Sequence, residues 1–75
     1  MQEKMIIIAQ STLTHAYKGE AILRSGGIWV QTIRLSGKKT QNGCGYGLSL
    51  RESDLNRALM LLRAKGAFIG QILRG

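Results

Sequence analysis

The run Met5-Ile6-Ile7-Ile8-Ala9, followed directly by Gln10-Ser11-Thr12, predicts a buried strand that leads into a helix. β-Branched residues dominate the apolar run, as is typical of a central strand. Ser11 and Thr12 are residue types that cap helices, and apolar or small side chains then recur at helical spacing as far as Arg24. Gly19 interrupts this helix, which indicates a close approach to the sheet.

Four further segments follow with clear patterns, two of strand composition, one helical and one final strand. They are Ile28 to Leu35, Tyr46 to Arg51, the helical set Leu55, Ala58, Leu59 and Leu62, and Ala67 to Leu73. The order strand, helix, strand, strand, helix, strand favours an α+β, ferredoxin-like βαββαβ sandwich. We therefore expect a single domain over residues 1–75, with a four-stranded antiparallel sheet and two helices on one face.

Charge and composition limit the classes of partner. The 75 residues hold 11 Lys and Arg against 4 Asp and Glu, a formal net charge of +7 that favours anionic partners. The cations are spread along the chain and aromatic residues are few, so nucleic-acid binding is allowed but not favoured. The longest apolar run is too short for a bilayer, and one cysteine cannot form an internal disulfide, so we expect a cytoplasmic protein without a membrane segment.

The glycine-rich stretch Ser36 to Gly47 contains the only cysteine of the chain. Cys44 lies between Gly43 and Gly45, and Lys38 and Lys39 precede it. Two nearby cations favour the thiolate and lower the pKa of a thiol, so Cys44 is a candidate nucleophile or sulfur carrier. The alternative is that Cys44 is a small buried hydrophobe, which is the usual state of a free cysteine.

A ferredoxin-like topology brings two of these features together. The first and second strands lead to the same end of the sheet, which would hold both the N-terminus of the first helix, near Ser11 and Thr12, and the loop with Cys44. A helix N-terminus stabilises a thiolate or a bound anion. His15 is a candidate proton partner for the thiol, with a surface role as the alternative. We expect no metal site and no cofactor.

Several of these residues, taken together, resemble a known family. Ser11-Thr12 opens a helix that carries Ala16 and Glu20, Gly27-Ile28 leads into the second strand, and Cys44-Gly45 precedes an apolar third strand. This combination resembles the DUF3343 family, described as selenium/sulfur carrier protein-like, over nearly the whole chain. The resemblance implies that Cys44 holds sulfur or selenium. It also implies partners that donate and accept the atom, either proteins or small thiols.

The sequence departs from the family pattern in one respect, and two other functions are alternatives to a sulfur carrier. Family members tend to have prolines and an arginine before the cysteine, whereas this chain has no proline and carries Lys38 and Lys39. The first alternative is a binding module, ACT-like in fold, that holds an anionic metabolite through Ser11, Thr12, Lys38, Lys39, Gly43 and Gly45. The second is nucleic-acid binding. A carrier or binding protein is favoured over a stand-alone enzyme, and the apolar Trp29, Met60 and Leu61 predict a homodimer.

Overall fold

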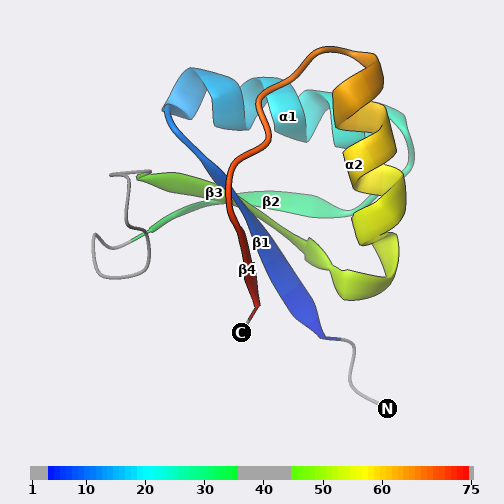
Figure 1. Cartoon of the computed structure of the whole chain (residues 1–75), viewed down its shortest axis with the longest axis horizontal. Helices are drawn as coiled ribbons and strands as arrows, with labels where there is room; N and C mark the ends of the chain where they lie inside the picture. Colours follow the sequence, from blue (N-terminus) through cyan, green and yellow to red (C-terminus); the bar gives the residue numbers. More distant parts are fainter. Residues whose placement is uncertain (1–3, 36–44, 75) are drawn as a thin grey trace.

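The four strands of the chain form one antiparallel sheet in the order β2-β3-β1-β4. The computed structural model describes residues 4–35 and 45–74. The strands are β1 (Met5–Gln10), β2 (Val30–Arg34), β3 (Tyr46–Arg51) and β4 (Ile72–Arg74), and the helices are α1 (Leu13–Ser25), the 3₁₀ turn η1 (Glu52–Asp54) and α2 (Leu55–Ala64) (Figure 1). The expected α+β ferredoxin-like fold, βαββαβ, is confirmed.

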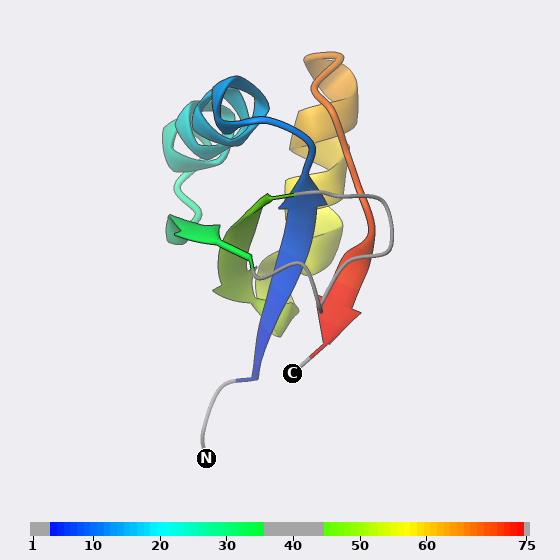
Figure 2. The ribbon, with the colours of Figure 1, turned by 90° about the vertical axis from the view of Figure 1, so that its left-hand side faces the viewer.

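The register of the strands separates a face covered by the helices from an open face. Ile6 and Ile8 of β1 pair with Leu50 and Leu48 of β3, and all four side chains are fully buried. The intervening Ile7, which alternation points to the opposite face, is only half-buried. Figure 2 shows β1 lying between β3 and β4, in agreement with its two ladders. The near-continuous apolar run of β1 therefore serves both faces of a central strand.

Helix α1 begins and packs as its sequence predicts. Thr12 is the N-cap, and its Oγ1 accepts a hydrogen bond from the His15 amide at 3.1 Å. Ala16, Gly19 and Leu23 form the buried stripe of the helix. A Cβ atom on Gly19 would lie 2.7 Å from Leu48 Cδ1, so the predicted close approach of α1 to the sheet is confirmed.

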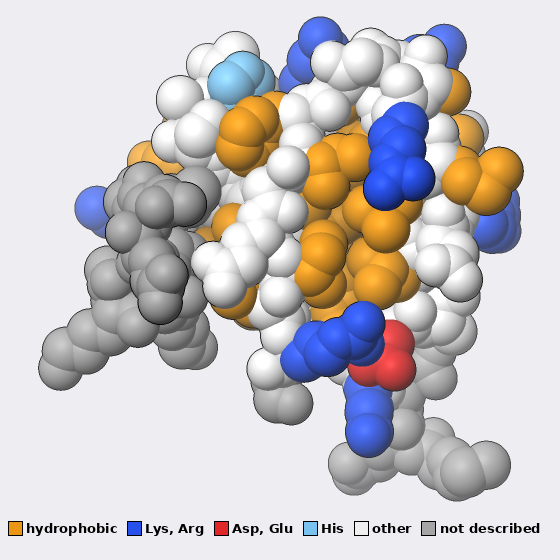
Figure 3. Space-filling model, viewed as in Figure 1, with side chains coloured by type: hydrophobic (Ala, Val, Ile, Leu, Met, Phe, Trp, Pro, Cys, Tyr) orange, Lys and Arg blue, Asp and Glu red, His pale blue; other side chains and the backbone are white. Residues whose placement is uncertain are grey.

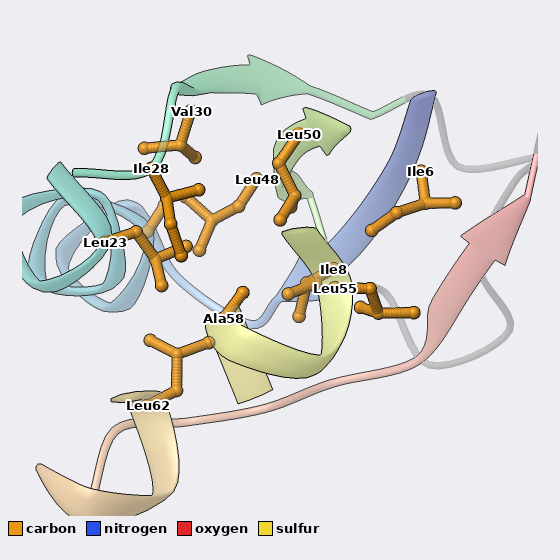
Figure 4. Close-up of a cluster of buried hydrophobic side chains, with 11 residues drawn as sticks. Ile6, Ile8, Leu23, Ile28, Val30, Leu48, Leu50, Leu55, Ala58 and Leu62 are labelled. Atoms are coloured by element: carbon orange, nitrogen blue, oxygen red, sulfur yellow. The ribbon is translucent and has the colours of Figure 1, made fainter. Parts of the chain in front are cut away.

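The core fills the layer between the sheet and the two helices (Figure 4). It is made entirely of aliphatic side chains, namely Ile6, Ile8, Ala16, Leu23, Ile28, Val30, Leu48, Leu50, Leu55, Ala58 and Leu62. Both helices contribute through the positions predicted from their spacing.

None of the helices in the described part of the chain is long and apolar enough to cross a membrane.

The final strand differs from expectation. The sequence predicts a strand from Ala67 to Leu73, but β4 covers only Ile72–Arg74. Pairing with β1 starts at Gln71, whose carbonyl accepts from the Ala9 amide at 2.8 Å. The residues before it connect the end of α2 to the sheet and run past the start of α1 (Figures 1 and 2). Apolar composition alone does not reveal this crossing, so the prediction was wrong for residues 67–71.

Candidate functional site

One end of the sheet gathers several of the residues predicted to form a site. Gln10, Tyr46 and Arg34 lie side by side there, because Tyr46 pairs with Gln10 on one side and with Arg34 on the other. One residue farther on, the Leu35 amide donates to the Gly45 carbonyl at 2.8 Å. Ser11 directly follows Gln10 and Gly45 directly precedes Tyr46, so both residues adjoin the last pair of the β1–β3 ladder.

Of the predicted site residues, three are therefore brought to one end of the sheet: Ser11, Thr12 and Gly45. Cys44, Lys38, Lys39 and Gly43 lie outside the described residues. The expectation that the loop with Cys44 shares this end with the start of α1 therefore stays a prediction, and only the residues that flank the loop, Leu35 and Gly45, are described at this end. Cys44 is joined covalently to Gly45, so the sequence links the cysteine to this end.

The N-terminus of α1 has the electrostatic character of an anion site. Its first turn contains no acidic residue that would offset the positive end of the helix dipole. Thr12 Oγ1 satisfies the His15 amide, and the Thr12 carbonyl accepts from the Ala16 amide at 3.1 Å. The amides of Leu13 and Thr14 precede the first intrahelical donors, and no acceptor for them occurs within residues 4–35 and 45–74. These two donors are available to an anion.

His15 pairs with a serine in the described structure. Its Nδ1 lies 2.8 Å from Ser11 Oγ, and its ring stacks on Phe68 with centroids 5.2 Å apart and planes 5° apart. The imidazole lies at the surface (Figure 3). Neutral His15 can accept the Ser11 hydroxyl proton at Nδ1, whereas protonated His15 would donate to Ser11 Oγ. The hydroxyl of Ser11 is thus oriented by a residue that is itself held by Phe68.

Gln10 is a residue of this region that the sequence prediction missed. It is fully buried, and its Nε2 donates to the Phe68 carbonyl at 3.4 Å. Its Oε1 has no hydrogen-bond partner among the described residues. The alternation of β1 could have indicated this, because Gln10 follows Ile6 and Ile8 at every second position and so lies on the face covered by the helices. The side-chain amide of Gln10 thus joins the end of β1 to Phe68, in the segment that connects α2 to β4.

Arg34 is a second missed residue, and it brings a cation to the same end. Arg24 of α1 donates to the Val30 carbonyl at 3.2 Å, and Glu20, one turn earlier, accepts from the Thr32 amide at 3.4 Å. From Val30 to Thr32 along β2, the contact on α1 thus moves back by one turn, from Arg24 to Glu20. Arg34 is the last residue of β2 and pairs with Tyr46, at the end of the sheet where β1 ends. Its position at the end of an edge strand was not recognised from composition.

Glu20 has a structural role. Its Oε1 lies 3.3 Å from Arg24 Nη2 and also accepts the Thr32 amide. The carboxylate therefore joins α1 to the edge of the sheet, as expected for a partly buried acid on an apolar stripe.

Within the described ranges, no three His, Cys, Asp or Glu side chains gather as they would around a metal ion.

Comparison with known proteins adds no relative. No family model matches the sequence, and no curated protein or solved structure matches it. The function of the chain has to be inferred from its own residues.

Proposed function

We propose that the protein is a small sulfur or selenium carrier that holds the atom on Cys44. The observation that carries the proposal is the position of Gly45. Its carbonyl accepts from the Leu35 amide, and the residue that follows it, Tyr46, pairs with Gln10, two residues before the N-cap of α1. The residue bonded to Gly45 is the only cysteine of the chain, and the resemblance to the selenium/sulfur carrier-like family rests on Cys44-Gly45 in combination with Ser11-Thr12.

The chemistry requires one thiolate and two partners. The Cys44 thiolate attacks the outer sulfur of a donor persulfide, a Cys44 S–S bond forms, the donor S–S bond breaks, and the donor leaves as a thiolate. In the second half, an acceptor thiolate attacks the outer sulfur of the Cys44 persulfide and regenerates the Cys44 thiolate. No second cysteine is present in the chain, so donor and acceptor are separate proteins or small thiols. A reducing compartment, the cytoplasm, suits this cycle.

The end of the sheet supports an anionic sulfur. The amides of Leu13 and Thr14, which have no acceptor in the described part of the chain, the helix dipole and Arg34 all favour negative charge there. In this proposal Lys38 and Lys39 add to the same field. These groups would lower the pKa of the Cys44 thiol from its ordinary value of about 8.5.

The pH dependence of Cys44 alkylation by iodoacetamide tests the proposal. We expect a midpoint below 8, and a gain of one sulfur in the intact mass after exposure to a persulfide donor, with both absent in Cys44→Ser. A midpoint at about 8.5 or above, or a cysteine that does not react in the folded protein, would refute the carrier.

The same amides favour one alternative, a module that binds a phosphate or carboxylate metabolite without covalent chemistry. Cys44→Ser would keep this binding, and the double variant Lys38→Ala with Lys39→Ala would lose it. The carrier predicts the opposite ranking of the two variants. Titration of both variants with inorganic phosphate, followed by heteronuclear NMR, separates the two functions.

A further inference from the structure

The two outer strands of the sheet, β2 and β4, differ in whether side chains bond to their outward backbone groups. In an antiparallel ladder, residues alternate between pairs that exchange hydrogen bonds and pairs whose amide and carbonyl groups point away from the partner strand. The bond from the Leu35 amide to the Gly45 carbonyl fixes this phase for β2. Val30, Thr32 and Arg34 therefore direct their backbone groups outward at the β2 edge.

Helix α1 occupies much of the β2 edge. Arg24 donates to the outward carbonyl of Val30, and Glu20 accepts the outward amide of Thr32. Both side chains come from the same face of α1 and also pair with each other. A further strand could add here only by breaking these contacts, so β2 is a protected edge.

No side chain among the described residues covers the β4 edge in this way. The bond from the Ala9 amide to the Gln71 carbonyl fixes the phase of β4, so that Leu73 pairs toward β1 while Ile72 and Arg74 direct their backbone groups outward. Within residues 4–35 and 45–74, no side chain or backbone group bonds to the outward amides and carbonyls of these two residues. This edge can accept a strand.

Apolar side chains line both faces of β4. Ile72 lies on the helix-covered face, where it joins the half-buried Leu59 and Ile69, and Figure 3 shows the apolar surface alongside β4 and α2. Leu73 lies on the open face beside its partner Ile7 and is also half-buried. An edge strand that is apolar on both faces suits a sheet that continues beyond it.

Charge distinguishes between the two possible occupants of this edge. Arg74 is paired with a carboxylate of the same chain, because its Nη1 lies 3.2 Å from Glu52 Oε2. Two copies of a chain with net charge +7 can meet here without setting unpaired cations against each other. An acidic segment of another protein would find Arg74 already paired with Glu52.

We propose that β4 pairs antiparallel with β4 of a second copy of this chain about a two-fold axis at Leu73. Ile72 then exchanges backbone hydrogen bonds with Arg74 of the second copy, and the symmetry repeats this pair. The two Leu73 side chains meet on the open face. The two sheets become one continuous sheet whose outer edges are both the protected β2. This surface is separate from the end of the sheet proposed to serve Cys44.

Matched proline variants test the interface. Arg74→Pro removes an outward amide at the β4 edge, and Arg34→Pro removes one at the β2 edge, so neither variant loses a backbone hydrogen bond of the described sheet. Arg74→Pro also loses the ion pair with Glu52, and Arg74→Ala, which loses the same ion pair but keeps the amide, is the control for that loss. We expect sedimentation equilibrium at micromolar concentration to give a dimer for the wild type and for Arg34→Pro. Arg74→Pro should raise the dissociation constant of the dimer at least about tenfold. Circular dichroism checks that both variants fold.

Cysteine crosslinking gives a second test that does not depend on proline. In the Cys44→Ser background, Leu73→Cys should oxidise readily to a disulfide dimer, because Cα atoms in such a pair are close enough for a disulfide. Gln31→Cys, on the same face but in β2, is the control and should crosslink much more slowly. A monomeric wild type would overturn the proposal and leave the edge to a segment of another protein. Equal effects of the two prolines, or equal crosslinking rates, would also overturn it.

Discussion

The Leu35 amide donates to the Gly45 carbonyl at 2.8 Å and extends the β2–β3 ladder, and Gly45 directly follows the only cysteine of the chain. Gly45 does not need to be glycine for the fold. A Cβ atom there would meet nothing within 4 Å, and Gly45 does not have a positive φ. The ladder could hold any small residue at this position.

Gly45→Ala should therefore leave the melting temperature nearly unchanged, within about 0.5 kcal/mol of stability, as for a surface substitution. If the glycine serves Cys44, the same variant should slow alkylation of the thiol. Differential scanning calorimetry and alkylation kinetics measure the two effects separately. A large drop in melting temperature would instead show that Gly45 serves the fold.

Arg34 should contribute to the field at this end of the sheet. Arg34→Ala is expected to raise the midpoint of Cys44 alkylation by a few tenths of a pH unit, since exposed charges act weakly through solvent. Arg63→Ala removes an exposed cation from the last turn of α2 and is the matched control. The shift in Arg34→Ala should shrink as salt is added. Identical midpoints in the two variants would remove Arg34 from the site.

Thr12 should stabilise α1 through its cap. Thr12→Ala is expected to lower the free energy of unfolding by about 1 kcal/mol, because the His15 amide loses its acceptor. Thr12→Ser keeps the side-chain oxygen and should retain most of the stability. Thr14→Ala, at an exposed position of the first turn, controls for the general effect of alanine. Urea denaturation followed by circular dichroism gives all three values.

Gln10 should contribute little to stability despite its complete burial. Gln10→Leu is expected to change the free energy of unfolding by no more than about 1 kcal/mol, because it removes an unpartnered oxygen together with one long hydrogen bond. Ile8→Ala, two residues earlier on the same face, should cost about 2–5 kcal/mol. A comparable loss in Gln10→Leu would mean that its bond to the Phe68 carbonyl is essential to the fold.

Gly19 marks the closest contact of α1 with the sheet. Gly19→Ala gains about 1 kcal/mol in helix propensity but forces Leu48, a fully buried side chain, to move. Overpacking of a core typically costs about 1–3 kcal/mol, so we expect a net loss. Lys18→Ala, at an exposed neighbouring position, should be close to neutral. Thermal unfolding of both variants checks the sign, and a stabilised Gly19→Ala would contradict this packing.

The sequence predicts most of the fold because local signals agree with the topology. Thr12 is a good cap, Gly19 is needed where α1 meets Leu48, and Tyr46–Arg51 alternates as a strand with one buried face. The final strand was predicted too long. The apolar residues at its start, Ala67, Phe68 and Ile69, belong to the connection after α2, in which Phe68 stacks on His15. Periodicity does not encode that crossing.

The candidate site could be predicted only in part. Capping chemistry points to Ser11 and Thr12, and an isolated cysteine between glycines points to Cys44. Gln10 and Arg34 belong to the same end because of strand register and the direction of α1 relative to β2, which are tertiary relationships. A single sequence does not state which residues of separate strands become neighbours.

The central position of β1 also has a consequence for folding. Its partners, β3 and β4, begin at Tyr46 and Ile72, so neither ladder of β1 is local, and β2–β3 is the only pair of neighbouring strands that is consecutive along the described chain. Such non-local pairing slows folding. During synthesis the apolar segment Met5–Ala9 leaves the ribosome long before either partner strand exists. The apolar segment of β1 therefore stays without a paired strand until β3 has been made.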